Sequence, residues 1–263
     1  MEGGAPTPFE RMLVTGARLL RPDGVYFVGF HWPMLVMRIA RRLQAAHAIV
    51  VYEDGIVEDG LTPTLPTSPS DLTAAVGATM CAGSLEALYM WLGAGRVDMA
   101  LLDAPIVDRR GNVNTTAVGD YDHPRVRLAG SGGGTELASL GRSLLLVSSS
   151  VHPRSYPERV DYITSPGFLN GRGDRERLGY APGTGPTWLL NPLGLFGFPE
   201  EQVAVASLHA GVSPDEVRAT FDWPIAVPAE PERLPEPTPE ELAATRTVLA
   251  EARERSYRLP EAA

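Results

Sequence analysis

The sequence predicts an α/β protein with an open, mostly parallel sheet flanked by helices. Short apolar runs of strand length, such as 48–52 (AIVVY) and 97–103 (VDMALLD), are the first observation. The second is the order strand 24–30, helix 33–46, strand 48–52, a βαβ unit that requires parallel strands and a right-handed crossover. The third is the spread of 27 glycines and 24 prolines between apolar segments, which indicates many turns.

The elements of the first half follow from periodicity and turn signals. Pro8 opens a helix over residues 8–20, which has an apolar side that includes Met12 and Leu13. Helix 33–46 has a proline in its first turn and is expected to present a basic outer face. The next segments, in order, are a Pro/Thr/Ser-rich loop (60–72), a helix (about 84–93) and the strand 97–103.

The second half contains more turns and ends in a charged tail. In order, the sequence predicts a hairpin turn (108–116), a strand (126–130) that runs into a glycine loop, a strand (143–149), an irregular segment (165–187), strands near 187–190 and 203–208, and a helix starting at Ser213. Residues 224–240 are a Pro/Glu linker, and the helix after it (about 239–256) is either solvated or a strap across a partner subunit. We therefore expect one α/β domain over 1–223 and a linker with a C-terminal helix over 224–263.

Charge and composition exclude several classes of function. The net charge of −9 argues against binding to nucleic acid or to a membrane surface, since both require a basic surface. No run reaches the roughly 18–20 apolar residues of a membrane span, and the N-terminus lacks a secretory signal pattern. The single cysteine, Cys81, cannot form an internal disulfide or a cysteine zinc cluster, and is expected to be a small buried residue. A cytoplasmic protein fits these features.

The stretch IVVYEDG (49–55) ends an apolar strand on Glu53, Asp54 and Gly55. One interpretation is a solvated turn, which is the usual role of such a triplet. The other is a reactive carboxylate, because ligands of open α/β sheets bind at the carboxyl ends of the strands. A carboxylate at that place can act as a base, an acid or a nucleophile, and the glycine allows close approach of a substrate.

A second candidate is the glycine-rich stretch AGSGGGTELAS (129–139), between a predicted strand and a predicted helix. Exposed N–H groups in such a loop bind anions or a developing oxyanion. The dinucleotide-binding fingerprint is weak here, because Thr135 occupies the position of its third glycine. A plain flexible loop remains the alternative.

Other polar residues give weaker signals. Asn112 and Asn114, in the predicted hairpin DRRGNVNTT, belong either to a surface turn or to a wall that they brace beside an active site. His31 follows a predicted strand and could face a pocket, although a structural role is more common. No two of the five histidines lie within five positions of each other, so no metal site is predicted.

Taken in order, these motifs resemble the β subunits of family I coenzyme A-transferases, in particular the glutaconate and 3-oxoacid CoA-transferase group. The motifs are IVVYEDG, LPTSPSDL, AGRVDMALLDAPIVDRRGNVNTT and AGSGGGTELAS, and the resemblance covers about residues 8–220. The third motif is the most specific of them.

The resemblance implies the family's fold, its mechanism and its site residues. Glu53 would be the covalent catalyst that carries a glutamyl-CoA thioester, and Gly132 and Gly133 would donate N–H groups to the oxyanions. Coenzyme A would be a co-substrate, with an acyl-CoA and a carboxylic acid as substrates and no permanently bound cofactor. A separately encoded α subunit would complete a heterotetramer or a higher multiple. The residues expected to bind substrate are Asp54, Gly55, Asn112, Asn114 and Gly130.

Two departures from the family pattern keep other functions open. Asp54 stands where the family has Ser or Asn, and its charge would tend to raise the pKa of the neighbouring glutamate and to repel dianionic substrates. The stretch 103–106 (DAPI) replaces a Gly-Gly-Ala-Gln stretch that is frequent in relatives. The alternatives are an acyl-CoA hydrolase or decarboxylase on the same fold, or a non-catalytic subunit that binds a partner.

Overall fold

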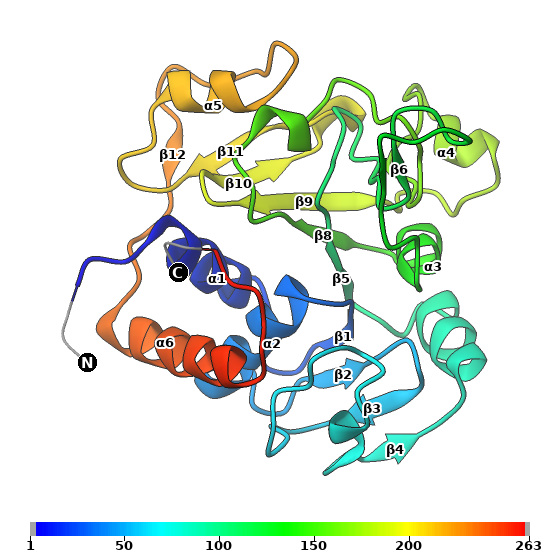
Figure 1. The fold of residues 1–263 in the computed structure, drawn as a ribbon, viewed down its shortest axis with the longest axis vertical. Helices are drawn as coiled ribbons and strands as arrows, with labels where there is room; N and C mark the ends of the chain where they lie inside the picture. Colours follow the sequence, from blue (N-terminus) through cyan, green and yellow to red (C-terminus); the bar gives the residue numbers. More distant parts are fainter. Residues whose placement is uncertain (1–3, 261–263) are drawn as a thin grey trace.

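A mixed sheet runs through the centre of the molecule and helices cover both of its faces, as the computed structural model of residues 4–260 shows (Figure 1). The elements, in chain order, are α1 (Pro8–Arg18), β1 (Val25–Val28), α2 (Trp32–Leu43), β2 (Ile49–Val51), β3 (Ile56–Glu58), η1 (Leu72–Ala75), β4 (Met80–Cys81), η2 (Glu86–Gly93), β5 (Met99–Asp103), β6 (Ala117–Val118), β7 (Val126–Arg127), α3 (Gly134–Leu140), β8 (Leu144–Val147), η3 (Pro153–Ser155), α4 (Asp174–Arg177), β9 (Pro186–Asn191), β10 (Gly194–Gly197), η4 (Pro199–Glu201), β11 (Ala204–Leu208), α5 (Pro214–Thr220), β12 (Glu232–Arg233) and α6 (Pro239–Glu254).

The sheet has ten strands in the order β12-β11-β10-β9-β8-β5-β1-β2-β3-β4. Its five central strands, β9, β8, β5, β1 and β2, run parallel to one another. Antiparallel pairs β9–β10, β10–β11, β2–β3 and β3–β4 extend it on both sides, and β6 and β7 form a separate hairpin. The open, mostly parallel sheet flanked by helices that the sequence predicts is therefore confirmed.

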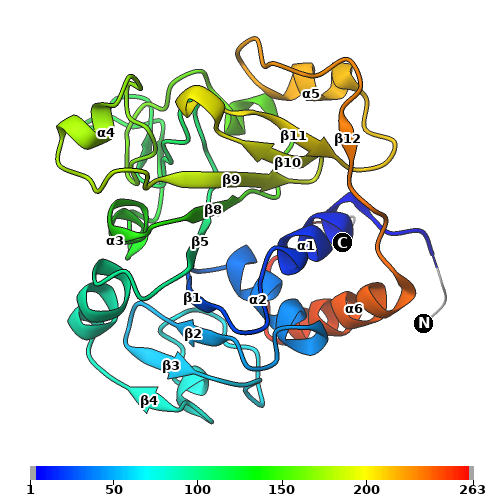
Figure 2. The ribbon, with the colours of Figure 1, turned by 180° about the vertical axis from the view of Figure 1, so that it is seen from behind.

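Two apolar cores lie on the two faces of the sheet, because successive side chains of a strand point to opposite faces. On β5, Leu101 packs against the α1/α2/α6 side, whereas Ala100 and Leu102 pack against the opposite side. On β1, Tyr26 packs on the α1/α2/α6 side and Phe27 packs on the opposite side. Figure 2 shows α1, α2 and α6 grouped on one face, whereas α3 belongs to the other core.

The N-terminal βαβ unit forms for local reasons. Thr7 caps α1 in a capping box with Glu10, with a proline at the start of the helix. Helix α2 follows β1 after His31, whose φ of 71° places the chain in a turn that residues other than glycine rarely adopt. Strand β2 then pairs in parallel with β1, which confirms the predicted strand–helix–strand order.

The expectation that α2 presents a basic outer face is wrong. Arg38 and Arg41 are both 5% exposed and point into the molecule. Arg41 forms an ion pair with Glu58 of β3 at 2.7 Å, and Arg38 forms one with Glu251 of α6 at 3.0 Å. The guanidinium groups thus hold neighbouring elements together instead of facing solvent.

The C-terminal helix α6 packs on its own chain, so the expectation of a solvated helix is wrong, and its contact with a partner subunit stays a prediction. Val248, Leu249 and Ala252 belong to the core on the α1/α2 side of the sheet. Within the Pro/Glu linker, Glu232 and Arg233 add the short strand β12 to the sheet edge. The division into 1–223 and 224–263 remains a prediction.

Three further segments complete the comparison with the sequence. Cys81 is exposed on the edge strand β4, so its expected burial is wrong. Helix η2 has π-helical geometry within the predicted segment 84–93. Segment 165–187 is irregular apart from the one-turn helix α4 and the start of β9. Among residues 4–260, no helix is long and apolar enough to cross a membrane.

Candidate active site

Glu53 and Asp54 form the turn of the β2–β3 hairpin. The Tyr52 N–H donates to the Ile56 carbonyl at 2.9 Å, and the Gly55 N–H donates to the Tyr52 carbonyl at 3.1 Å. Gly55 has a φ of 99°, and a Cβ at this position would lie 2.0 Å from the Ala82 carbonyl oxygen. The turn therefore requires glycine for both its conformation and its contact with the segment after β4.

This turn lies at the carboxyl edge of the parallel sheet, where the strand order reverses. Strand β1 is followed in the chain by β2 on one side, and β5 lies on its other side. Such a switch point leaves a crevice beyond the strand ends. A cavity of about 390 Å³ occupies it, with Glu53 in its lining together with Gly29 and Phe30 after β1 and Leu102 and Asp103 at the end of β5. The turn is thus also a part of the cavity wall, and the reactivity of the Glu53 carboxylate stays a prediction.

The Glu53 carboxylate contacts the glycine loop before α3. The Gly133 N–H donates to Glu53 Oε2 at 2.6 Å, across 80 residues of sequence. A Cβ at Gly133 would lie 2.4 Å from the same oxygen, so only glycine fits against the carboxylate. Gly133 is the N-cap of α3 and has no capping side chain, and the start of a helix favours a negative charge.

The other glycines of the loop line the cavity. Gly132 has a φ of 48°, and a Cβ there would lie 3.5 and 3.6 Å from the two carboxylate oxygens of Glu53. Gly130, with a φ of 97°, also lines the cavity, and the Gly134 N–H is bonded to the Ser131 carbonyl at 2.8 Å. The loop predicted from AGSGGGTELAS therefore lies against the predicted carboxylate.

Asp54 does not belong to the lining of the Glu53 cavity. Its Oδ1 atom is buried and has no hydrogen-bond partner among the described residues. Burial raises the pKa of the Asp54 carboxyl above its ordinary value. A substrate-binding role for Asp54 stays a prediction.

Asn112 and Asn114 are buried, and both hydrogen-bond to the backbone around them. Asn112 Oδ1 accepts hydrogen bonds from the Gly167 and Leu169 N–H groups at 2.9 and 3.0 Å. Asn114 Oδ1 accepts from the Thr116 N–H at 2.9 Å, and its amide nitrogen donates to the Ala117 carbonyl. Both side chains are 1% exposed, so they are not parts of a surface turn. Their direct binding of substrate stays a prediction.

Phe30, 52% exposed, and Ser165 line the cavity and were not singled out from the sequence. Asp103, from the stretch 103–106 in which the sequence departs from the family pattern, and Thr115 of the predicted hairpin line it as well. Asp103 Oδ2 lies 3.5 Å from His31 Nδ1. Among residues 4–260, no group of three or more His, Cys, Asp or Glu side chains is arranged to hold a metal ion.

Comparisons with known proteins agree with this geometry. A model of the family described as coenzyme A transferase matches residues 9–177. The B subunit of a 3-oxoadipate CoA-transferase from Pseudomonas knackmussii is 36% identical over 92% of both chains. The B subunit of the glutaconate CoA-transferase from Acidaminococcus fermentans is 29% identical over 87% of both chains.

The crystal structure of glutaconate coenzyme A-transferase from Acidaminococcus fermentans has the same fold. It superimposes with a TM-score of 0.82 and 27% identity, over 95% of this chain and 94% of that one. The family match over more than half the chain and the identity to the B subunits of two CoA-transferases lead to one assignment. The chain belongs to the coenzyme A transferase family, as a β-type subunit of its family I.

Proposed function

We propose that the chain is the β subunit of a heteromeric CoA-transferase in which Glu53 is the nucleophile. The observation that carries the proposal is the Glu53 carboxylate at the crevice of the sheet, held by the Gly133 N–H at 2.6 Å. The residue type, the strand-end position and the adjacent glycine loop all match the family's covalent catalyst. CoA is the family's co-substrate, and acyl-CoAs and carboxylic acids are the proposed substrates.

The reaction proceeds through two kinds of acyl intermediate on Glu53. The carboxylate oxygen attacks the acyl-CoA carbonyl and expels the CoA thiolate, which leaves a mixed anhydride. The thiolate then attacks the Glu53 carbonyl carbon and expels the donor acid as its carboxylate, which leaves the glutamyl-CoA thioester. An acceptor carboxylate repeats the two steps in reverse order. Each attack adds a negative charge to the carbonyl oxygen concerned.

The Gly133 N–H is the proposed donor for the steps at the Glu53 carbonyl carbon. It already donates to a Glu53 oxygen, so it is aimed at the oxyanion that forms when thiolate or acceptor attacks this carbon. Gly132 lies beside the same carboxylate, and its N–H is proposed as the second donor. Donors fixed before the reaction require no reorganisation in the transition state.

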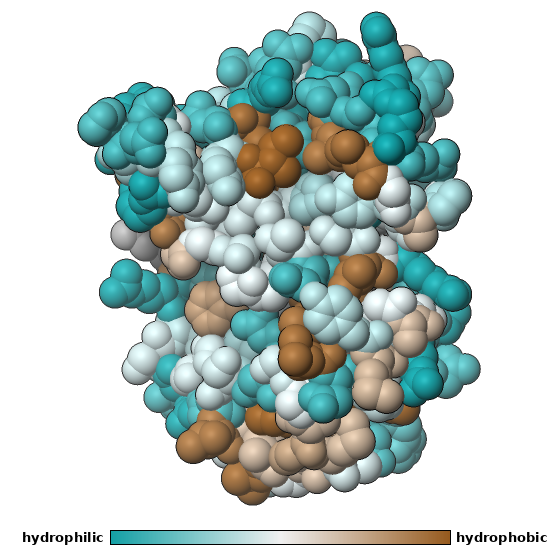
Figure 3. Space-filling view, turned by 90° about the vertical axis from the view of Figure 1, so that its right-hand side faces the viewer, coloured by the Kyte–Doolittle hydropathy of each residue, from teal (hydrophilic) through white to brown (hydrophobic). Residues whose placement is uncertain are grey.

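A separate α subunit is proposed to complete the site in a heterotetramer. Both of the CoA-transferase relatives carry a name that implies a second subunit. Next to the Glu53 turn, Leu85, Tyr89 and Met90 of the η2 region are 69%, 54% and 55% exposed. Figure 3 shows apolar patches on the face that carries α3 and α4. Exposed apolar surface of this kind marks a protein contact.

The test is intact-mass analysis of the chain, co-purified with its α partner and incubated with acyl-CoAs. We expect a CoA adduct on Glu53 that disappears when an acceptor acid is added. The Glu53→Gln variant should assemble normally but form no adduct and lose transfer. Asp59→Asn, an exposed acid in the same hairpin, is the matched control and should keep activity.

Other outcomes would favour the other functions. Free CoA or carbon dioxide without an adduct would indicate a hydrolase or a decarboxylase. Full activity of Glu53→Gln would exclude this residue as the nucleophile. No turnover from a well-formed complex, over a broad panel of acyl-CoAs, would favour a non-catalytic subunit.

A further inference from the structure

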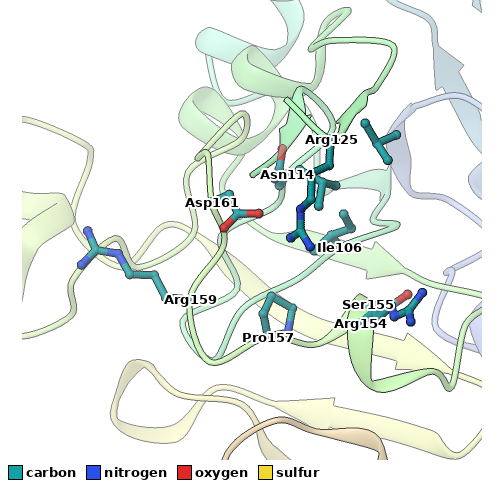
Figure 4. A pocket seen from close by; sticks show the side chains of 10 residues that line it. Ile106, Asn114, Arg125, Arg154, Ser155, Pro157, Arg159 and Asp161 are labelled. Carbon is teal, nitrogen blue, oxygen red and sulfur yellow. The ribbon is translucent and has the colours of Figure 1, made fainter. Parts of the chain in front are cut away.

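A second cavity, of about 630 Å³, is lined by neighbours in sequence of residues that line the Glu53 cavity (Figure 4). Pro105 and Thr115 line the Glu53 cavity, whereas their neighbours Ile106 and Asn114 line the second one. We call the second one the basic cavity, because its charged lining residues are Arg125, Arg154, Arg159 and Asp161. The lining thus has three positive charges and one negative charge, in a chain with a net charge of −9.

The three arginines of the basic cavity are exposed, and their guanidinium groups make no hydrogen bond or ion pair with any residue between 4 and 260. Elsewhere in the chain, arginines such as Arg18 and Arg246 pair with glutamates at 2.7 and 2.8 Å. Guanidinium groups left unpaired around a concave site are suited to an anionic ligand.

Asp161 offsets one of the three positive charges and leaves the lining of the basic cavity with a net positive charge. Its Oδ2 accepts a hydrogen bond from the Gly119 N–H at 2.7 Å, and it forms no ion pair within the described chain. In Figure 4, Arg125 extends toward Ile106, Arg154 lies beside Ser155, and the Arg159 guanidinium points outward. We take Arg125 and Arg154 of the lining as the two candidates for contact with a ligand, with Arg159 at the rim.

One stretch of backbone connects the two cavities. Arg125 and Val126 line the basic cavity, and residues 128–132 of the same stretch line the Glu53 cavity. Seven residues span at most about 25 Å when fully extended. A ligand with an anionic end and a long flexible arm can therefore follow this stretch from Arg125 to the glycine loop.

We propose that the basic cavity binds the phosphate groups of coenzyme A while the pantetheine arm carries the thiol to Glu53. This inference rests on the proposed function and assigns the phosphate-binding residues. Arg125 and Arg154 form charge-assisted hydrogen bonds to phosphate oxygens, for which the planar guanidinium is well suited. Ser155, in the same lining, is available as a neutral donor.

The experiment compares two thioesters of one acyl group, acyl-CoA and acyl-pantetheine, which lacks the phosphates. The complex with the α partner is assayed as wild type, Arg125→Ala and Arg154→Ala. We expect each substitution to raise the KM for acyl-CoA about tenfold and to leave kcat unchanged, because it removes one charge-assisted hydrogen bond to a phosphate. The KM for acyl-pantetheine should not change.

Two variants sharpen the comparison. Asp161→Asn removes the one negative charge of the lining and should lower the KM for acyl-CoA. Arg218→Ala removes an exposed arginine of α5 that pairs with Asp215, and should change neither KM. Size-exclusion chromatography of each complex checks that the subunits stay associated.

Three results would overturn the assignment. Equal changes in KM for both thioesters would show that the arginines do not act through phosphate. A change confined to the KM of the acceptor acid would make the cavity a carboxylate site, and loss of the complex would make it a contact with the α subunit. Titration of the complex with CoA and with pantetheine gives the same comparison without turnover, so it separates failure of this inference from failure of the proposed reaction.

Discussion

Gly133 lies so close to the Glu53 carboxylate that its position leaves no room for a side chain. A Cβ would lie 2.4 Å from Oε2 and 3.2 Å from the Cβ of Glu53, and both neighbours belong to the proposed nucleophile. The φ of −81° and ψ of 6° at Gly133 are accessible to alanine, so the substitution acts through this contact and leaves the backbone unstrained.

We predict that Gly133→Ala lowers kcat at least about 100-fold, because the displaced carboxylate no longer meets the acyl carbon in the productive geometry. Steady-state kinetics of the complex measures it. Gly60→Ala is the control, since a Cβ at Gly60 has no atom within 4 Å and kcat should be unchanged. Wild-type kcat in Gly133→Ala would show that the carboxylate is not held against this loop during the reaction.

At the same scale, the sequence predicted the chemical groups but not all of their contacts. Glu53 and Gly133 are candidates from local patterns, a strand end and a glycine run. The hydrogen bond between them spans 80 residues and depends on the sheet order, which local patterns do not contain. For Asn112 and Asn114, the sequence did not decide between a surface and a buried position. A polar hairpin sequence does not reveal that these side-chain amides turn inward and hydrogen-bond to the backbone.

Helices α2 and α6 show why charged helices are hard to interpret from sequence. Arg38 and Arg42 of α2 both pair with Glu251 of α6, so charged residues lie within the contact between the two helices. A pattern that equates charge with solvent assigns these residues to an outer face. The apolar contact of α6 with the core is confined to a few residues, Val248, Leu249 and Ala252.

Because one side of α6 is buried, shortening a side chain on that side should lower the free energy of unfolding strongly. Leu249 is 1% exposed, and Leu249→Ala should lower the free energy of unfolding by about 2–5 kcal/mol through lost burial and the cavity left behind. Thr247→Ala, on the exposed side of the same helix, should change it by no more than about 0.5 kcal/mol. Urea unfolding of the two variants measures the difference, and equal midpoints would mean that α6 does not pack on this chain in solution.

Over the whole molecule, the strands that could be predicted from the sequence are those in a short βαβ unit or with a clear apolar run. Strands β1 and β2 follow from one βαβ unit, and the apolar runs of β5, β8 and β11 mark their own positions. Strand β3 ends on Glu58, which pairs with Arg41 of α2, and β10 is a four-residue strand with a glycine at each end. Neither has a long apolar run that local patterns can detect, so these two strands were not predicted.

His209 links the two halves of this architecture. It follows β11, and its ring reaches Thr15 of α1 through Nε2 at 3.0 Å and the Pro192 carbonyl through Nδ1 at 3.0 Å. Because a carbonyl only accepts, the proton of the neutral ring is on Nδ1, and Nε2 accepts from the Thr15 hydroxyl. Burial lowers the pKa of His209 below its ordinary 6.5, more than the bond to Pro192 raises it.

This shift sets the sign of a pH effect on the whole fold. A histidine with a lowered folded pKa binds its proton more readily in the unfolded chain, so its contribution to stability is present above 6.5 and is lost as the pH falls. The loss has a slope of at most about 1.4 kcal/mol per pH unit, the value for one proton. The carboxyls with lowered pKa, such as Glu10 and Glu241, titrate below 4.5 and contribute to acid sensitivity only at lower pH.

We therefore predict that the free energy of unfolding falls between pH 6.5 and 5 in the wild type, and that this fall is smaller in His209→Gln. Glutamine can donate to the Pro192 carbonyl and accept from Thr15, but it does not titrate. Urea unfolding at pH 7.5, 6 and 5 compares the two proteins. Since both share all other titrating groups, parallel profiles would mean that His209 has the same proton affinity in the folded and unfolded chain, and that its burial between α1 and the sheet does not control the acid stability of the fold.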